Sequence, residues 1–177
     1  MKKKILPISI LFALACTLVI SGCSKDEDPR FTMPVEVTVF IPAEFNTIET
    51  HTVELFSIPN QIQLALQQNG MAANQITSIV PGRGELIPVS PNVQYQLLNN
   101  ITVNVSPVDD ITDLNEIYYN DFVEFDHSGN LELLSSISEL KNTMETGVFN
   151  LQMKYTLRQS LLTTTEHKLR FNLAVYD

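Results

Sequence analysis

Two segments near the C-terminal end of the chain alternate between apolar and polar residues. The first, residues 149–157, reads FNLQMKYTL, and the second, residues 167–175, reads HKLRFNLAV. A period of two places successive side chains on opposite faces of a β-strand, so each segment predicts a strand with one buried face. The short polar stretch 159–164 between them predicts that the two strands pair as an antiparallel hairpin.

Shorter segments with a similar pattern occur along the rest of the chain. The predicted strands cover residues 34–41, 52–58, 75–80, 93–98, 101–106, 117–125 and 131–134. Strands with one apolar face need a second layer to cover that face, and for this many strands the second layer is another sheet. The sequence therefore predicts a mainly β fold, an antiparallel β-sandwich of the Ig-like or jelly-roll-like kind.

One or two short helices are expected to cap the ends of this sandwich. Residues 59–70 place apolar side chains at helical spacing and end in Asn-Gly, a helix stop. A second helix is expected to begin near Ser136, because Ser136 and Glu139 have the spacing of a capping box. Residues 81–84, Pro-Gly-Arg-Gly, are interpreted as a hairpin turn.

The N-terminal segment has the layout of a secretory signal peptide. Three lysines at positions 2–4 precede an apolar run over residues 5–20, which ends in Ser21 and Gly22. This run is shorter than the roughly 20 residues that a membrane-spanning helix needs, so removal during export is the preferred interpretation.

The residues Ile20-Ser21-Gly22-Cys23 resemble the lipobox of bacterial lipoproteins, with Ile in place of the usual Leu. The resemblance implies that signal peptidase II cuts before Cys23 and that Cys23 carries acyl chains, while an ordinary secreted protein is the alternative. Several acyl chains give stable membrane anchoring where one gives only marginal binding. We therefore expect residues 1–22 to be the signal peptide, residues 23–32 a flexible acidic tether from lipidated Cys23, and residues 33–177 a single β-sandwich domain.

The stretch after Cys23, SKDEDP, resembles the acidic export signal of surface lipoproteins in the Bacteroidota. This resemblance implies an outer-membrane protein on the cell surface, with the periplasmic leaflet as the alternative. From Cys23 to Met33 the tether has about ten residues, and at about 3.3–3.6 Å per residue it would let the domain lie roughly 30 Å from its anchor.

The chain that remains after cleavage is strongly acidic. Residues 1–22 hold three of the 11 Lys and Arg residues and none of the 20 Asp and Glu residues, which leaves a net charge of −12 with neutral histidine. This charge disfavours nucleic acid and anionic lipid surfaces, which are bound through Lys and Arg.

The two cysteines are Cys16, lost with the signal peptide, and Cys23, so no disulfide or thiol site is expected in the domain.

Acidic residues gather in a region without Lys or Arg, between Arg83 and Lys141. Carboxylates and carbonyls are the ligands of Ca²⁺, which makes a calcium site conceivable in the loop that carries Asp109, Asp110, Asp113 and Glu116. The spacing does not match an EF-hand loop, and a solvated acidic loop is the preferred interpretation.

Half of the basic residues after Cys23 lie on the outward positions of the two alternating segments. If these segments pair as a hairpin, Lys154, Arg158, Lys168 and Arg170 form a basic strip. Such a strip would bind an acidic partner, either an anionic glycan or a protein, unless acids of the same molecule compensate it.

Signals for catalysis are weak, and no enzyme is predicted. The three histidines form no ligand motif, and His167, on the inner side of its strand, is expected to be a hydrogen-bonded core residue. Asp121 and Glu124 would be the acid pair of a hydrolase.

The expected function is a noncatalytic binding or structural module of the cell envelope, without a cofactor. The alternatives are a glycan-binding accessory protein, a subunit of a larger assembly or, less favoured, a hydrolase.

Overall fold

The computed structural model describes residues 28–43, 45–89, 94–125, 127 and 129–177. The predicted signal peptide and residues 23–27 of the predicted tether, Cys23 included, lie outside these residues. The end of the tether was predicted too late, because Phe31 and Thr32 already belong to the first strand and the backbone N–H of Arg30 donates to the carbonyl oxygen of Val175, 2.8 Å away. None of the described helices is long and apolar enough to cross a membrane.

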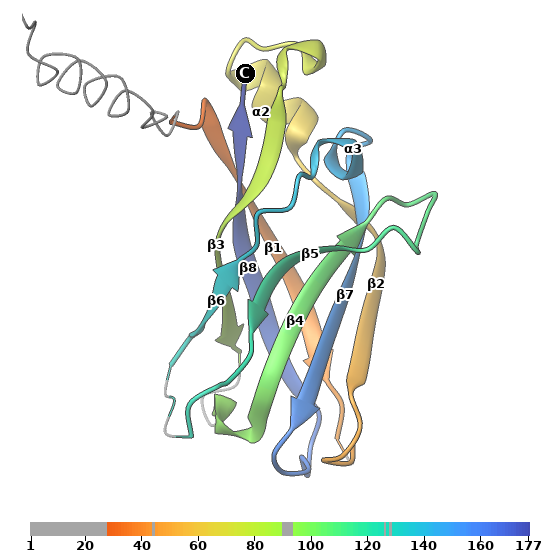
Figure 1. The fold of residues 1–177 in the computed structure, drawn as a ribbon, viewed down its shortest axis with the longest axis vertical. Helices are drawn as coiled ribbons and strands as arrows, with labels where there is room; N and C mark the ends of the chain where they lie inside the picture. Colours follow the sequence, from red (N-terminus) through yellow and green to blue (C-terminus); the bar gives the residue numbers. More distant parts are fainter. Residues whose placement is uncertain (1–27, 44, 90–93, 126, 128) are drawn as a thin grey trace, which may run out of the picture.

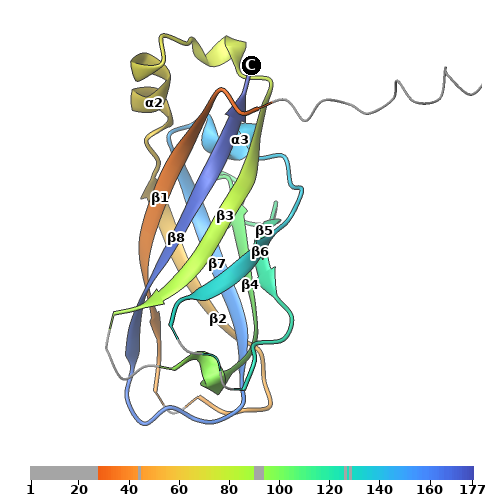
Figure 2. The same cartoon turned by 90° about the vertical axis from the view of Figure 1, so that its left-hand side faces the viewer.

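Eight antiparallel strands form one sheet that folds over into two facing layers (Figures 1 and 2). One layer, which we call the β8 layer, consists of β1 (Phe31–Ile41), β8 (Thr165–Tyr176), β3 (Ser78–Pro88) and β6 (Leu131–Ser135). The other, the β7 layer, consists of β5 (Asn115–Asn120), β4 (Leu98–Ser106), β7 (Val148–Leu157) and β2 (His51–Pro59). The predicted mainly β, antiparallel sandwich is confirmed.

The two layers are joined along one side only. There β5 pairs with β6 through Tyr118 opposite Ser135 and Tyr119 opposite Leu134, so the hydrogen-bonded sheet turns the corner between the layers. On the opposite side β1 and β2 are the two edge strands. Pro34 falls on β1, where a missing backbone donor is tolerated because one edge of the strand has no neighbour in the sheet.

The predicted hairpin between the two alternating segments is wrong, although both segments are strands. β7 pairs with β2 and β4, whereas β8 pairs with β1 and β3 in the other layer. The link 158–164 therefore crosses from one layer to the other. Alternation specifies which face of a strand is buried, and burial against a facing layer satisfies it as well as burial beside a paired neighbour.

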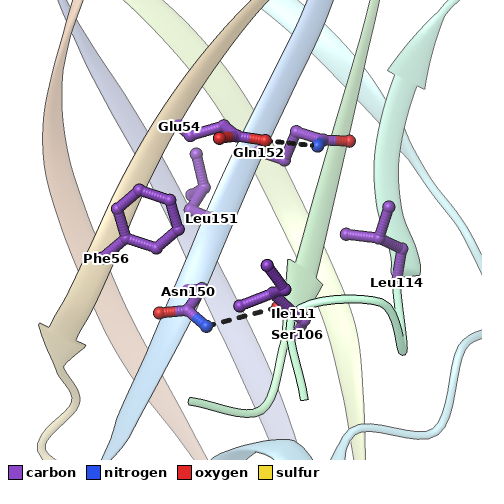
Figure 3. A pocket seen from close by; sticks show the side chains of 8 residues that line it. All are labelled: Glu54, Phe56, Ser106, Ile111, Leu114, Asn150, Leu151 and Gln152. Carbon is purple, nitrogen blue, oxygen red and sulfur yellow. Dashed lines mark hydrogen bonds between the residues drawn. The ribbon is translucent and has the colours of Figure 1, made fainter. Parts of the chain in front are cut away.

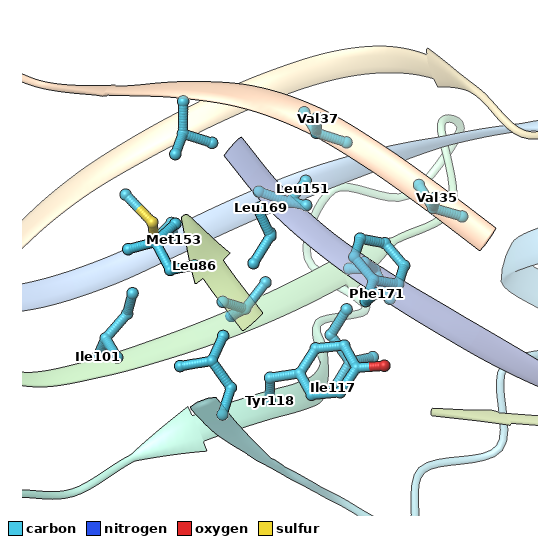
Figure 4. Close-up of a cluster of buried hydrophobic side chains, with 14 of the residues drawn as sticks. Val35, Val37, Leu86, Ile101, Ile117, Tyr118, Leu151, Met153, Leu169 and Phe171 are labelled. Carbon is cyan, nitrogen blue, oxygen red and sulfur yellow. The ribbon is translucent and has the colours of Figure 1, made fainter. Parts of the chain in front are cut away.

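The core fills the space between the layers. Leu169 and Phe171 of β8 and Val35 of β1 enter it from one side, and Leu151 and Met153 of β7 enter it from the other (Figure 4). Each of these side chains is at most 8% exposed. Burying a side chain of this size contributes about 1.5–3 kcal/mol, so the pairing of the two apolar faces is the main source of stability.

His167 is a core residue, as predicted. It is fully buried, with Nδ1 3.1 Å from the Tyr95 hydroxyl and Nε2 2.8 Å from the Thr165 hydroxyl. Burial lowers the pKa of His167 to about 4, so the imidazole is neutral at pH 7.

The predicted helix within residues 59–70 is confirmed as α2 (Ile62–Gln68), which buries Ile62 and Leu66. Gly70, with a φ of 65°, ends the helix in the left-handed region that glycine adopts without strain.

The second helix begins later than predicted. Residues 136–140 are not helical, and α3 spans only Lys141–Met144. The Glu139 carboxylate does not close a capping box with Ser136 but accepts hydrogen bonds from the backbone N–H groups of Ile79 and Lys141, each 2.9 Å away. Burial alone would raise the pKa of Glu139, but these bonds outweigh it and leave the pKa below its usual value.

Three predicted strands differ in extent from the observed ones. Strand 75–80 begins only at Ser78 after the 3₁₀ turn η2 (Ala73–Gln75), strand 93–98 is replaced by η3 (Tyr95–Leu97), and strand 117–125 ends at Asn120. In η3, Tyr95 and Leu97 are buried, so this turn closes one end of the core rather than extending a sheet.

Residues 81–84 form a bulge inside β3 and not the predicted hairpin turn. The register of β3 against β8 shifts between Pro81 and Gly84, and the strand continues. A Cβ on Gly84 would lie 2.7 Å from the ring of Tyr118, so glycine is needed for the ring to pack against the backbone. The Tyr118 hydroxyl in turn donates a hydrogen bond to the carbonyl oxygen of Asn172, 3.1 Å away.

Gly84→Ala is expected to lower the free energy of unfolding by about 1–3 kcal/mol, because the added methyl group collides with the Tyr118 ring. Urea denaturation of the two proteins measures this difference. The same substitution in a Tyr118→Leu background should cost clearly less, since the ring is gone. Additive losses in the double variant would contradict the proposed contact.

Candidate functional site

The two ends of the sandwich are built from different elements. The first residues of β1, the C-terminus of β8, α2 and α3 lie at one end, which we call the helical end (Figures 1 and 2). Four strand-connecting loops meet at the opposite end, which we call the tip: residues 42–50, 89–97, 121–130 and 158–164. The start of β1 and the tip therefore lie a full strand length apart.

Hydrogen bonds tie the tip loops to one another. The backbone N–H of Ala43 donates to the hydroxyl of Thr164, 3.2 Å away, and joins the first loop to the last. The N–H of Val123 donates to the carbonyl oxygen of Asn99, 3.0 Å away, and ties the 121–130 loop to the start of β4.

Arg158 is the central residue of the tip. Its guanidinium donates hydrogen bonds to the carbonyl oxygens of Leu98, 2.6 Å away, of Gln96, 3.4 Å away, and of Val123. These carbonyls belong to β4, to η3 and to the 121–130 loop. One charged group thus ties two separate segments of the chain, residues 96–98 and the 121–130 loop, to the residue that follows β7.

The same guanidinium supports two aromatic side chains. Its central carbon lies 4.2 Å from the ring centroid of Phe125 and 5.0 Å from that of Phe122. Cation–π contacts of this kind contribute about 0.5–1 kcal/mol at exposed sites. They hold both rings at the surface, where 59% of Phe122 and 67% of Phe125 are exposed.

Each tip loop exposes at least one large apolar side chain. The exposed fractions are 90% for Ile48, 44% for Val89, 59% for Phe122, 67% for Phe125 and 95% for Leu162. Single exposed apolar residues are normal, but their presence on every loop of one rigid end is typical of an interaction surface.

Two open hollows flank the aromatic pair. The larger, of about 750 Å³, is lined by Asn120, Phe122, Glu124, His127, Asn130, Leu131 and Glu132. The smaller, of about 460 Å³, is lined by Gln96, Phe125, Arg158 and Gln159. Much of the polar lining is already engaged: Glu132 bonds to Arg83, and His127 Nε2 lies 3.0 Å from the carbonyl oxygen of Asn130.

The predicted acid pair is not brought together at a hollow. Asp121 and Glu124 are both exposed in the 121–130 loop, but only Glu124 lines the larger hollow.

The predicted basic strip does not form, because its members lie on different layers. Lys154 is on the outer face of β7 and Arg158 directly follows the last residue of that strand, whereas Lys168 and Arg170 are on the outer face of β8. The strip depended on a hairpin that is absent from the described sheet, whose order separates β7 from β8.

The bases of β8 are compensated within the molecule. Glu36 on β1 lies 2.7 Å from Lys168 and 3.0 Å from Arg170, and Glu85 on β3 lies 3.4 Å from Arg170. Hydrogen bonds from Lys168 and Arg170 lower the pKa of Glu36 below its usual value. Such exposed pairs add little to stability, so their effect is mainly to neutralise this face.

The acidic loop between β4 and β5 keeps its carboxylates in solvent. Asp109, Asp110, Asp113 and Glu116 are all exposed. Asp110 accepts hydrogen bonds from the hydroxyl and the backbone N–H of Thr112, which lower its pKa. Among the residues that the structure describes, no three His, Cys, Asp or Glu side chains are grouped so as to hold a metal ion. Calcium binding by this loop stays a prediction.

A third hollow, which we call the lateral groove, lies on the outer face of the β7 layer (Figure 3). It has a volume of about 280 Å³ and is lined by Glu54, Phe56, Ser106, Ile111, Leu114, Asn150, Leu151 and Gln152. Ile111 and Leu114 belong to the acidic loop, so this loop contributes apolar walls as well as charge.

Neither the tip nor the lateral groove was predicted from the sequence. The sequence pattern predicts that Phe122 and Phe125 belong to a strand, and it predicts a solvated acidic loop around Ile111. The segment DFVEFD, in which two phenylalanines are surrounded by acids, is a usable signal for the tip, because an apolar residue within a charged run is seldom part of a core.

Comparisons with known proteins name no family. No family model matches the chain, and no curated protein matches it. Similar solved structures include the P-domain of Macrobrachium rosenbergii nodavirus, at 9% identity and a TM-score of 0.28, over 81% of this chain and 94% of that one. They also include a chain of Triatoma virus, at 10% identity and a TM-score of 0.28, over 100% of this chain and 76% of that one. At these scores the likeness carries no argument about this protein.

Arg158→Lys is expected to lower the free energy of unfolding by about 2 kcal/mol, because an ammonium group cannot reach three carbonyls at once. Denaturant unfolding measures the loss. Lys154→Met, on the same face of β7, is the matched control and should change stability by no more than about 0.5 kcal/mol. Equal effects of the two substitutions would contradict the role given to Arg158.

Proposed function

We propose that this protein is a lipid-anchored lipoprotein of the outer membrane, exposed on the cell surface, that binds a protein partner through its tip without catalysis. The observation that carries the proposal is that all four tip loops expose large apolar side chains, on an end where Arg158 bonds to Gln96, Leu98 and Val123. The anchor part of the proposal rests on the resemblance of residues 20–23 to a lipobox.

The placement of the tip supports this arrangement. The described chain enters the sandwich at the helical end, where β1 begins with Phe31, and the tip is at the other end (Figure 1). A chain anchored at Cys23 would therefore present the tip away from its membrane. An acidic tether from Cys23 to the start of β1 at Phe31 has about eight residues and would add reach of up to roughly 25 Å.

The exposed side chains favour a protein partner over a glycan. The chain has no Trp, and three of its five Tyr residues, Tyr95, Tyr118 and Tyr155, are fully buried and unable to stack on a sugar. Aliphatic residues such as Ile48 and Leu162 suit burial in a protein interface, whose centre is dry and apolar.

A glycan is the second candidate, because the larger hollow sets polar groups of Asn120, Glu124 and Asn130 beside the ring of Phe122. A hydrolase has weaker support. Glu132, the other acid of that hollow, is held by Arg83.

The lipid anchor predicts that the chain incorporates a fatty acid at Cys23. Cells of a Gram-negative host that express the full precursor and are fed an alkyne-tagged palmitate analogue should yield a labelled protein in the membrane fraction. Cys23→Ala should abolish the label, and Cys16→Ala is the matched control that should retain it. Label that persists in Cys23→Ala, or an unlabelled wild-type protein, would refute the anchor. Protease treatment of intact cells distinguishes the surface from the periplasmic leaflet.

The tip predicts a site-specific contact with a partner. A photo-crosslinking amino acid at position 162 should give a discrete product with another envelope protein in its native host. The same amino acid at position 137, where Ile137 is 99% exposed in the segment before α3, should give none. Phe122→Ser should reduce the product at position 162 by about tenfold, as expected for an interface anchor worth about 1.4 kcal/mol.

Equal crosslinking from positions 162 and 137, or no effect of Phe122→Ser, would contradict a specific tip interface. A polysaccharide product at position 162 would favour the glycan alternative instead.

A further inference from the structure

We propose that the lateral groove is a second binding site, which takes a polypeptide segment with an apolar side chain flanked by Lys or Arg. The groove lies on the outer face of the β7 layer, whereas the proposed function depends on the anchor and the tip. An experiment can therefore refute one proposal without affecting the other.

Apolar walls give the groove its shape. Phe56 on β2 forms one side and Ile111 and Leu114 of the acidic loop form the other, with β7 as the floor (Figure 3). Phe56 and Ile111 are each 59% exposed and Leu114 is 39% exposed, so burying their free surface would contribute to binding. The volume of about 280 Å³ includes space open to solvent, so the groove is shallow and suits a single side chain rather than a folded surface.

Acidic residues occur on two of the elements that form these walls. Glu54 lines the groove, and the exposed acids Asp109, Asp110 and Asp113 are on the same loop as Ile111 and Leu114. The base on this face is Lys154, two residues beyond Gln152 along β7 and toward the tip. A segment that places Lys or Arg beside its apolar side chain complements this pattern, whereas an acidic segment or an anionic lipid is repelled.

An unpaired acceptor adds a specific polar contact. The side-chain amide of Gln152 donates to Glu54, with Nε2 and Oε1 2.9 Å apart, which fixes the orientation of the amide. Its own oxygen, Oε1, points to the side of Leu114 in Figure 3, and it is buried without a hydrogen-bond partner among the described residues. A buried carbonyl oxygen that lacks a partner is costly. With less than 1 Å² accessible, Gln152 Oε1 accepts a hydrogen bond from a bound segment only when the side chains that cover it move aside.

This combination selects one class of ligand. A metal ion would use the carboxylates but not the apolar walls, and an uncharged apolar ligand would leave Gln152 Oε1 unpaired. A basic and apolar polypeptide segment uses all three features: the walls, the acids and the unpaired oxygen.

The test uses the full chain in neutral detergent and a fluorescein-labelled peptide with one leucine between two pairs of lysines. Fluorescence anisotropy should show saturable binding that weakens as salt is raised from low to physiological concentration. The same peptide with glutamate in place of lysine, or serine in place of leucine, should bind at least about tenfold more weakly.

Three variants locate the peptide. Ile111→Ser should weaken binding about tenfold by removing a wall, while Leu162→Ser, at an aliphatic position on the tip that is even more exposed, should leave it unchanged. Asp109→Asn combined with Asp113→Asn should weaken binding and flatten its salt dependence.

Gln152→Met is the most informative variant, because the Tm of the free protein and its affinity for the peptide should respond differently. Removing the unpaired oxygen should leave the Tm of the free protein unchanged or raise it by about 2–4 °C, yet weaken peptide binding. Equal binding by wild type and Ile111→Ser, preference for the glutamate peptide, or unaltered affinity of Gln152→Met would each overturn the proposal. None of these outcomes depends on Cys23 lipidation or on tip crosslinking.

Discussion

Burial of two apolar sheet faces against each other is the interaction on which the rest of this structure depends. Neither layer has an alternative cover, because the short helices α2 and α3 lie at one end of the sandwich and not over a face. Most connections between consecutive strands pass from one layer to the other. The loops are therefore gathered at the two ends, and one end becomes a compact group of four loops. The tip is thus a consequence of how the core is closed.

The sequence predicted which residues are buried much better than it predicted which strands pair. The period of two in β7 and β8 correctly identified Met153, Tyr155, Leu169 and Phe171 as core residues. It did not reveal that β7 and β8 belong to different layers, because a facing layer and a neighbouring strand both satisfy an apolar face. Errors in the candidate sites followed from that one ambiguity. The four bases that a hairpin would align are instead divided between two outer faces.

The sites themselves rest on long-range contacts that no local pattern encodes. Arg158 finds carbonyls in segments more than 30 residues away in the chain, such as Leu98 and Val123. The lateral groove likewise joins β2, β7 and the loop after β4, and Gln152 is unusual only in its surroundings. Gly84 is a similar case. The segment Pro-Gly-Arg-Gly predicted a turn, whereas in the structure a glycine is needed at position 84 because the ring of Tyr118 packs against the backbone there. In each case the residue type is explained by a neighbour that is distant in sequence.

The pairing of β1 with β8 has a further consequence for how the molecule is made. β8 follows the other seven described strands in the chain, and it lies between β1 and β3 in its layer. Until β8 has been synthesised, β1 lacks its paired neighbour in the described sheet. Sheets dominated by such distant pairings fold slowly and expose unpaired edges meanwhile. The β8 layer therefore cannot be completed before β8 has been made, and loss of this twelve-residue strand would remove the centre of a layer rather than trim an edge.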